Sequence, residues 1–92
     1  MGGVDFTRPP EEAEVYPATH HFKAICDAAA IDEAALAAAA AGFDVRAPFA
    51  RGRSSSGGKY VTYEASVHFA SRAEHHRFHE GVKTVAGVRI LL

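Results

Sequence analysis

The segment 60–69, YVTYEASVHF, constrains the fold more than any other part of the chain. Every second residue from Val61 to Phe69 is apolar or aromatic, and the residues between them, from Thr62 to His68, are polar. Successive side chains of a β-strand point to opposite faces, so this period of two predicts a strand that is buried on one side only. The rest of the chain must therefore supply a sheet with one covered face and one open face.

Three weaker segments are predicted to complete that sheet. Residues 20–26 (HHFKAIC) contain no glycine or proline and read as a first strand. Residues 45–53 (VRAPFARGR) include Pro48, which cannot donate a hydrogen bond to a ladder and so indicates an edge strand. Residues 88–92 (VRILL) are short and carry a central arginine, as expected of the other edge.

An alanine-rich helix is predicted within residues 27–42. Alanine is the best helix former, and Gly42 suits the residue just past a helix end. Asp32 is the expected N-cap, with Asp27 as an alternative that would lengthen the helix.

A second helix is predicted to begin at Ser71, because the spacing of Ser71 and Glu74 is that of a capping box. Four residues fall on one narrow stripe of that helix at 100° per residue: His75, Phe78, Val82 and Val85. Gly87 then separates the helix from the last strand.

The order of elements is therefore strand, helix, strand, strand, helix, strand. Two right-handed βαβ halves of this kind give an α+β, ferredoxin-like sandwich, in which a four-stranded antiparallel sheet of order 4-1-3-2 carries both helices on one face. A chain of 92 residues has room for one such domain, predicted over residues 16–92. Residues 1–15 show no period and are expected to form a flexible acidic arm.

Composition narrows the classes of function. Ten Lys and Arg against eleven Asp and Glu give a formal charge of −1, which excludes a globally basic nucleic-acid binder. A single cysteine excludes a disulfide framework and a cysteine-based zinc site. Apolar runs are too short to cross a membrane and no secretory signal is recognisable at the N-terminus, so a cytoplasmic location is expected.

Several short stretches, in their order and spacing, give residues 16–92 a family likeness. Tyr16-Pro17 followed by FKAI (22–25), then SSSGGKY (54–60) and VRILL (88–92), resemble the YbeD-like family of small bacterial proteins of unknown function. The resemblance implies a ferredoxin-like fold similar to ACT regulatory domains, a cytoplasmic bacterial setting and no established enzymatic activity. It further implies a regulatory role, with a loose link to lipoate metabolism.

The clearest candidate for a ligand site is the loop between the second and third strands. Four cations and no acid lie between Val45 and Tyr63. Backbone N–H groups of a Gly/Ser loop with flanking cations can hold a phosphate or a carboxylate. The candidate residues for a small anionic ligand are Arg53, Ser54, Ser55, Ser56 and Lys59. The run lacks the spacing of a nucleotide-binding P-loop, and the alternative interpretation is a solvated hairpin.

Other reactive side chains do not combine into a recognisable centre in the sequence. His75 and His79 have the i, i+4 spacing of paired metal ligands, but no third ligand is evident, so no metal or other cofactor is predicted. Cys26 is expected to be a small buried hydrophobe. Residues 54–56 have no evident partner base, and no catalytic residue is assigned. The sequence therefore predicts a domain that is not an enzyme.

The functional prediction is a small regulatory or interaction domain that binds a small anion or a protein partner. A homodimer is expected to form through the last edge strand or the open sheet face. In that strand Ile90 is expected to share the orientation of Val88 and Leu92, which would make one of its faces apolar.

An RNA-binding module is the alternative function, because RRM domains share this topology. Stacking of RNA bases requires aromatic side chains on the open face of the sheet. The alternation places Tyr63 and Phe69 on the covered face and leaves Tyr60 alone on the open one. The sequence therefore argues against nucleic acid as the partner.

Overall fold

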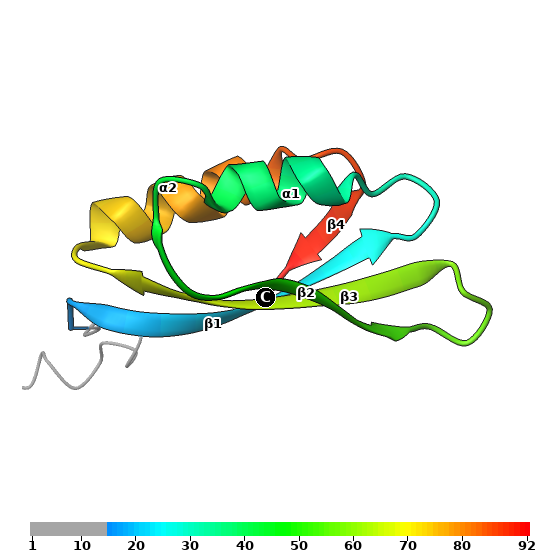
Figure 1. The fold of residues 1–92 in the computed structure, drawn as a ribbon, viewed down its shortest axis with the longest axis horizontal. Helices are drawn as coiled ribbons and strands as arrows, with labels where there is room; N and C mark the ends of the chain where they lie inside the picture. Colours follow the sequence, from blue (N-terminus) through cyan, green and yellow to red (C-terminus); the bar gives the residue numbers. More distant parts are fainter. Residues whose placement is uncertain (1–14) are drawn as a thin grey trace, which may run out of the picture.

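The computed structural model describes residues 15–92, and it has the expected α+β, βαββαβ arrangement (Figure 1). The elements are β1 (Ala18–Asp27), α1 (Glu33–Ala40), β2 (Asp44–Ser54), β3 (Tyr60–Phe69), α2 (Arg72–Lys83) and β4 (Val88–Leu91). The four-stranded antiparallel sheet has the order β2-β3-β1-β4, which is the predicted 4-1-3-2 read from its other edge. Of the predicted acidic arm, only Val15 lies within the described residues.

The two central strands determine which side chains enter the core. β1 and β3 pair along their whole lengths, from Ala18 opposite Phe69 to Asp27 opposite Tyr60. Both helices lie on one side of the sheet (Figure 1), and the alternate residues of β3 that face them are buried. The buried apolar residues are Phe22, Ala24, Cys26, Leu36, Ala40, Val61, Tyr63, Ala65, Val67, Phe69, Phe78 and Val82. The covered and open faces predicted from the period of two are therefore confirmed.

α1 begins after Asp32, the expected N-cap, and not after the alternative, Asp27. The Asp32 carboxylate accepts hydrogen bonds from the backbone N–H groups of Ala34 and Ala35, which leaves Asp27 as the last residue of β1. Residues 28–30 form a turn instead of the first helical residues. The helix is therefore shorter than the longest prediction, because Asp27 is already paired with β3.

α2 begins as the capping box predicts, with one difference. The Ser71 hydroxyl accepts from the backbone N–H of Glu74 at 3.3 Å, but the Glu74 carboxylate accepts from the N–H of Ala70 rather than of Ser71. Phe78 and Val82 are fully buried on its inner side. His75 and Val85 complete the stripe half-buried.

β4 departs from the predicted alternation because of a β-bulge. Cys26 of β1 lies opposite Val88 while its neighbour Ile25 lies opposite Ile90, so Arg89 is an extra residue on β4. Because of this extra residue, Val88 and Ile90 point to opposite faces of the sheet, although simple alternation would place them on the same face. Val88 therefore lies opposite the buried Cys26, whereas Ile90 lies on the open face opposite Ile25. The prediction that Ile90 shares the orientation of Val88 was wrong, since a local bulge leaves no trace in a five-residue hydrophobic pattern.

β2 is the other edge strand, as Pro48 predicts. Its pairing with β3 shifts register three times, between Val45 and Ser54. The loop that joins it to β3 turns through Gly57 and Gly58, which both have positive φ angles.

Candidate binding surface

The five residues predicted to hold an anion lie along the outside of the β2–β3 hairpin, and all are exposed. Ser55 closes this hairpin itself. Its backbone N–H donates to the carbonyl of Tyr60 at 2.8 Å, and its hydroxyl accepts from the N–H of Tyr60 at 3.0 Å. The backbone N–H of Ser55, one of the donors expected to face an anion, is therefore used to stabilise the turn.

Two of the four cations near this loop are paired with carboxylates. Arg46 donates two hydrogen bonds to Asp44, at 3.0 and 2.9 Å. These hydrogen bonds, with the charge of Arg46, hold the pKa of the Asp44 carboxyl below its usual value. The Arg51 guanidinium lies 3.5 Å from Glu33. Asp44 lies one position before the sequence window that looked uniformly basic, and Glu33 lies farther back, on α1.

Glu33 also accepts a hydrogen bond from the hydroxyl of Tyr63, whose ring is buried in the core. Burial, together with this carboxylate, raises the pKa of Tyr63. The cluster of Glu33, Tyr63 and Arg51 joins the first residue of α1 to β3 and β2. It is a structural contact in which the exposed charges of Arg51 and Glu33 balance each other.

A groove of about 660 Å³ lies beside β4, at the end of the sheet where β1 meets the β2–β3 hairpin. Its lining residues are Ile25, Tyr60, Val88, Arg89 and Ile90. None of the five predicted loop residues lines this groove, but the ammonium of Lys59 lies 5.5 Å from the centre of the Tyr60 ring, which does line it.

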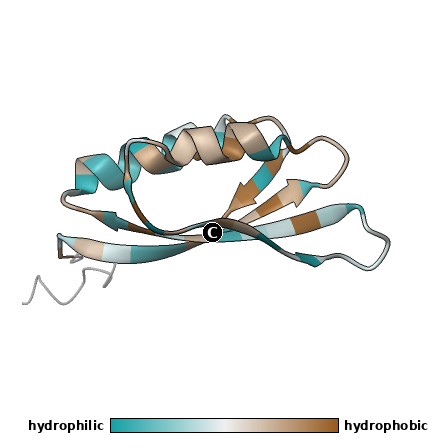
Figure 2. Ribbon diagram, in the orientation of Figure 1, coloured by the Kyte–Doolittle hydropathy of each residue, from teal (hydrophilic) through white to brown (hydrophobic). Residues whose placement is uncertain are grey.

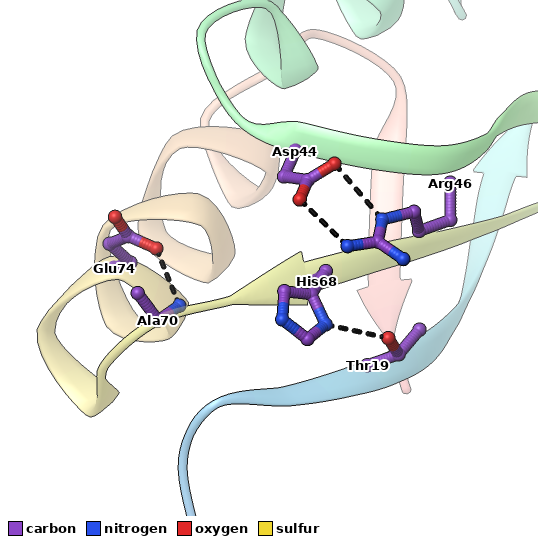
Figure 3. A network of polar contacts seen from close by, with 6 residues as sticks. All are labelled: Thr19, Asp44, Arg46, His68, Ala70 and Glu74. Atoms are coloured by element: carbon purple, nitrogen blue, oxygen red, sulfur yellow. Dashed lines mark hydrogen bonds and ion pairs between the residues drawn. The ribbon is translucent and has the colours of Figure 1, made fainter.

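The remainder of the open face is polar, and its side chains bind one another across the strands. Thr19 of β1 and His68 of β3 are hydrogen-bonded at 2.8 Å, beside the Asp44–Arg46 pair of β2 (Figure 3). Hydrophilic and hydrophobic residues are mixed along the strands, as expected of a sheet with one polar and one buried face (Figure 2). This half of the face therefore offers few unsatisfied groups to a ligand.

One cross-strand row on this face has the composition of a hydrolase triad. His21 donates from Nε2 to Glu64 at 2.8 Å, and its Nδ1 is hydrogen-bonded to the Ser66 hydroxyl at 3.2 Å. Sequence reasoning missed the row, because it depends on the register that places His21 opposite Ser66.

The row lacks the surroundings that such chemistry needs. The side chains of His21 and Glu64 are 58% and 46% exposed, and acyl transfer depends on donors aimed at an oxyanion in a site that excludes water. The backbone N–H groups of central strands are instead used in the sheet ladder. The row accounts for cross-strand hydrogen bonding and gives no basis for a reaction.

A further group of rings packs at the start of β1. The rings of His20 and His75 lie 4.3 Å apart between centres, and His75 is hydrogen-bonded to the Tyr16 hydroxyl at 2.7 Å. His79 lies elsewhere, near Glu80. Within residues 15–92 no three His, Cys, Asp or Glu side chains are grouped as metal ligands. Cys26 is buried, and burial raises its pKa.

Among the described helices, none has the length and apolar character required to cross a membrane. A family model described as "Protein of unknown function (DUF493)" matches residues 11–92. No curated protein and no solved structure matches the chain. The match covers most of the sequence, including every strand and helix, so the chain belongs to the DUF493 family, whose function is uncharacterised.

Proposed function

We propose that this chain is a small interaction domain, without a catalytic step, that binds a segment of a partner protein in extended conformation at β4. The observation that carries the proposal is the position of the groove. The groove lies on the open face across β3, β1 and β4, and β4, which forms one side of it, has β1 on one flank and, among the described residues, no strand on the other. An extended peptide commonly binds by adding to such an edge.

The backbone of β4 is suited to this addition. Leu92 and Lys23 exchange both of their backbone hydrogen bonds, at 3.1 and 2.8 Å. In an antiparallel ladder the next residue then points its N–H and C=O away from the partner strand. Leu91 therefore directs its backbone groups toward the outer side, where an incoming segment would lie.

Apolar side chains next to that edge supply the other part of the contact. Ile90 is 49% exposed and Leu92 is 65% exposed, and both are large hydrophobic residues. Ile90 lines the groove with Ile25 and Tyr60. Covering these residues with an apolar side chain removes their surface from water, which is the main favourable term in most protein association.

This mode has more support than a small anion at the hairpin loop. The loop residues are exposed and Ser55 is engaged in the turn. RNA binding has less support still, because Tyr63 and Phe69 are buried and cannot stack on bases. A regulatory role, as the likeness to ACT domains and the YbeD-like family implies, follows if binding at β4 changes the activity of the partner.

The test is a titration of isotope-labelled protein with a capped octapeptide of alternating valine and threonine, followed by the amide signals in nuclear magnetic resonance. We expect the shifts to concentrate in residues 88–92 and at Ile25 and Tyr60. Ile90→Lys should abolish them, because a charge would then lie in the apolar contact. Ala38→Lys is the matched control, since it adds the same charge at an exposed position of α1.

A second titration, with inorganic phosphate, tests the alternative anion site at the hairpin loop. Shifts confined to residues 53–59 on adding phosphate would support the anion site instead. Peptide shifts that fail to appear in β4, or that survive Ile90→Lys, would overturn the proposed function.

A further inference from the structure

We infer that the segment accepted at β4 carries an acidic side chain, which pairs with Arg89 and Lys59 at the rim of the groove. The inference rests on the proposed function and adds the chemistry of the partner. The occupant is thus an extended, acidic and apolar segment of another protein.

One cation lines the groove, and two others are neighbours of residues that line it. Arg89 lines it, and Lys59 lies against the ring of Tyr60, which also lines it. Lys23 stands on β1, two residues before Ile25 and therefore on the same open face. Within residues 15–92, none of these three cations forms an ion pair, although five ion pairs occur elsewhere in the described part.

The nearest carboxylates are already engaged. Glu64 lies opposite Lys23 in the register, but it accepts from His21 at 2.8 Å. Asp27 lies opposite Tyr60, but its carboxylate accepts from the N–H of Ala29 at 3.2 Å in the turn after β1. Both carboxylates keep their negative charge, so the three cations exceed them by one, and a carboxylate from outside the domain would balance that excess.

The bulge explains why Arg89 is available. An extra residue on a bulged strand is left out of the regular pairing, so its side chain is not held in a cross-strand contact. An arginine in the edge strand also discourages that edge from pairing with a copy of itself. A second β4 would bring a second Arg89 to an edge of only four residues. These features favour an acidic partner over a homodimer.

The experiment compares three capped octapeptides that differ only at a central position occupied by glutamate, glutamine or lysine. We expect the glutamate peptide to bind about fivefold more tightly than the glutamine peptide, as for one partly exposed ion pair, and the lysine peptide most weakly. The preference should shrink in about 0.5 M NaCl, where exposed charges are screened.

Variants assign the preference to particular cations. Arg89→Gln and Lys59→Gln should each reduce the discrimination between the glutamate and glutamine peptides. Arg53→Gln is the matched control, because it removes the same charge from β2, at a position without an ion pair in the described structure. It should leave the discrimination intact.

The possible results distinguish the acidic partner from the more general binding of an extended segment at β4. Equal binding of the glutamate and glutamine peptides at β4 would overturn the acidic partner and leave the interaction domain standing. Binding of none of the three peptides would overturn both. A dimer in sedimentation that Ile90→Lys dissociates would assign the edge to a second copy and likewise overturn the acidic partner.

Discussion

β2 runs for eleven residues along one edge of the sheet, whereas β4 runs for four residues along the other. Long edge strands invite unwanted pairing, and proline, bulges and charges are the usual protections. β2 has Pro48 and three shifts of register against β3. β4 has a single bulge at Arg89 and two exposed apolar residues, Ile90 and Leu92. The longer edge is thus the better protected.

The two edges also differ in whether their cations are paired with carboxylates. On β2, Arg46 and Arg51 are paired with Asp44 and Glu33, and Arg53, near the hairpin end, has no ion pair among the described residues. On β4, Arg89 has no ion pair within the described residues and lines the groove. A cation that is already paired with a carboxylate gains little free energy from contact with a second anion. An unpaired cation next to apolar surface can still gain it. The comparison teaches that the number of cations in a segment predicts a binding site poorly unless their partners are known.

The largest predicted effect on stability comes from adding a side chain to the backbone at each edge. A Cβ placed on Gly87, just before β4, would lie 2.5 Å from the Cα of Ile31, and Gly87 has a φ of +94°. A Cβ on Gly52 of β2 would lie 3.3 Å from the carbonyl oxygen of Thr62. We expect Gly87→Ala to cost at least about 3 kcal/mol, since backbone strain alone reaches this size and backbone overlap adds to it. Gly52→Ala should change the free energy of unfolding by less than about 1 kcal/mol.

Urea denaturation of both variants measures the difference. Gly81→Ala in α2 is a useful control, because a Cβ there meets nothing within 4 Å and alanine favours the helix. It should stabilise the protein by about 0.5–1 kcal/mol. Similar losses for Gly87→Ala and Gly52→Ala would mean that the two edges are equally adaptable, and that β4 is not a fixed platform for a partner.

The elements whose chemistry is local could be predicted from the sequence. The period of two over 60–69, the cap at Asp32 and the cap at Ser71 each depend on residues a few positions apart, and the structure contains all three. The strand order followed from the same elements, because the right-handed βαβ rule leaves few topologies. These features needed no knowledge of which distant residues meet.

The binding surface could not be predicted in this way. The groove depends on the bulge at Arg89, and the bulge depends on how β4 aligns with β1. The hairpin loop looked basic because Glu33, which pairs with Arg51, lies 18 positions earlier on α1. Lys59, predicted as an anion ligand with the serines of the loop, lies against the ring of Tyr60, a contact that the sequence pattern did not indicate.

An intermediate effect is expected at the contact that holds α1 to the β2 side. Tyr63→Phe removes the hydroxyl that donates to Glu33, and it should cost about 1 kcal/mol because the carboxylate is partly exposed. Burial and Glu33 raise the pKa of Tyr63 above its unfolded value. Its contribution is therefore complete below pH 10 and is lost as the pH rises through the folded pKa.

Stability measured between pH 8 and 11.5 tests this sign. The wild-type protein should lose part of its stability at the alkaline end, and Tyr63→Phe should lose less. Tyr60→Phe is the matched control, since it removes a hydroxyl from the open face of the same strand and keeps Tyr63. A Tyr63→Phe variant with the full alkaline loss would show that the cluster does not hold the β2 side.

The smallest effect is expected from the exposed pair on β2. The hydrogen bonds from Arg46 lower the pKa of Asp44, so the pair contributes stability above the ordinary carboxyl pKa near 3.8 and loses it as the pH falls through the folded value. Asp44→Asn and Arg46→Gln should each flatten this acid limb, measured by thermal unfolding between pH 5 and 2. Arg53→Gln should leave it unchanged. Should the limb persist in both pair variants, Arg46 would be as available as Arg89, and the contrast between a neutralised edge and a receptive one would no longer hold.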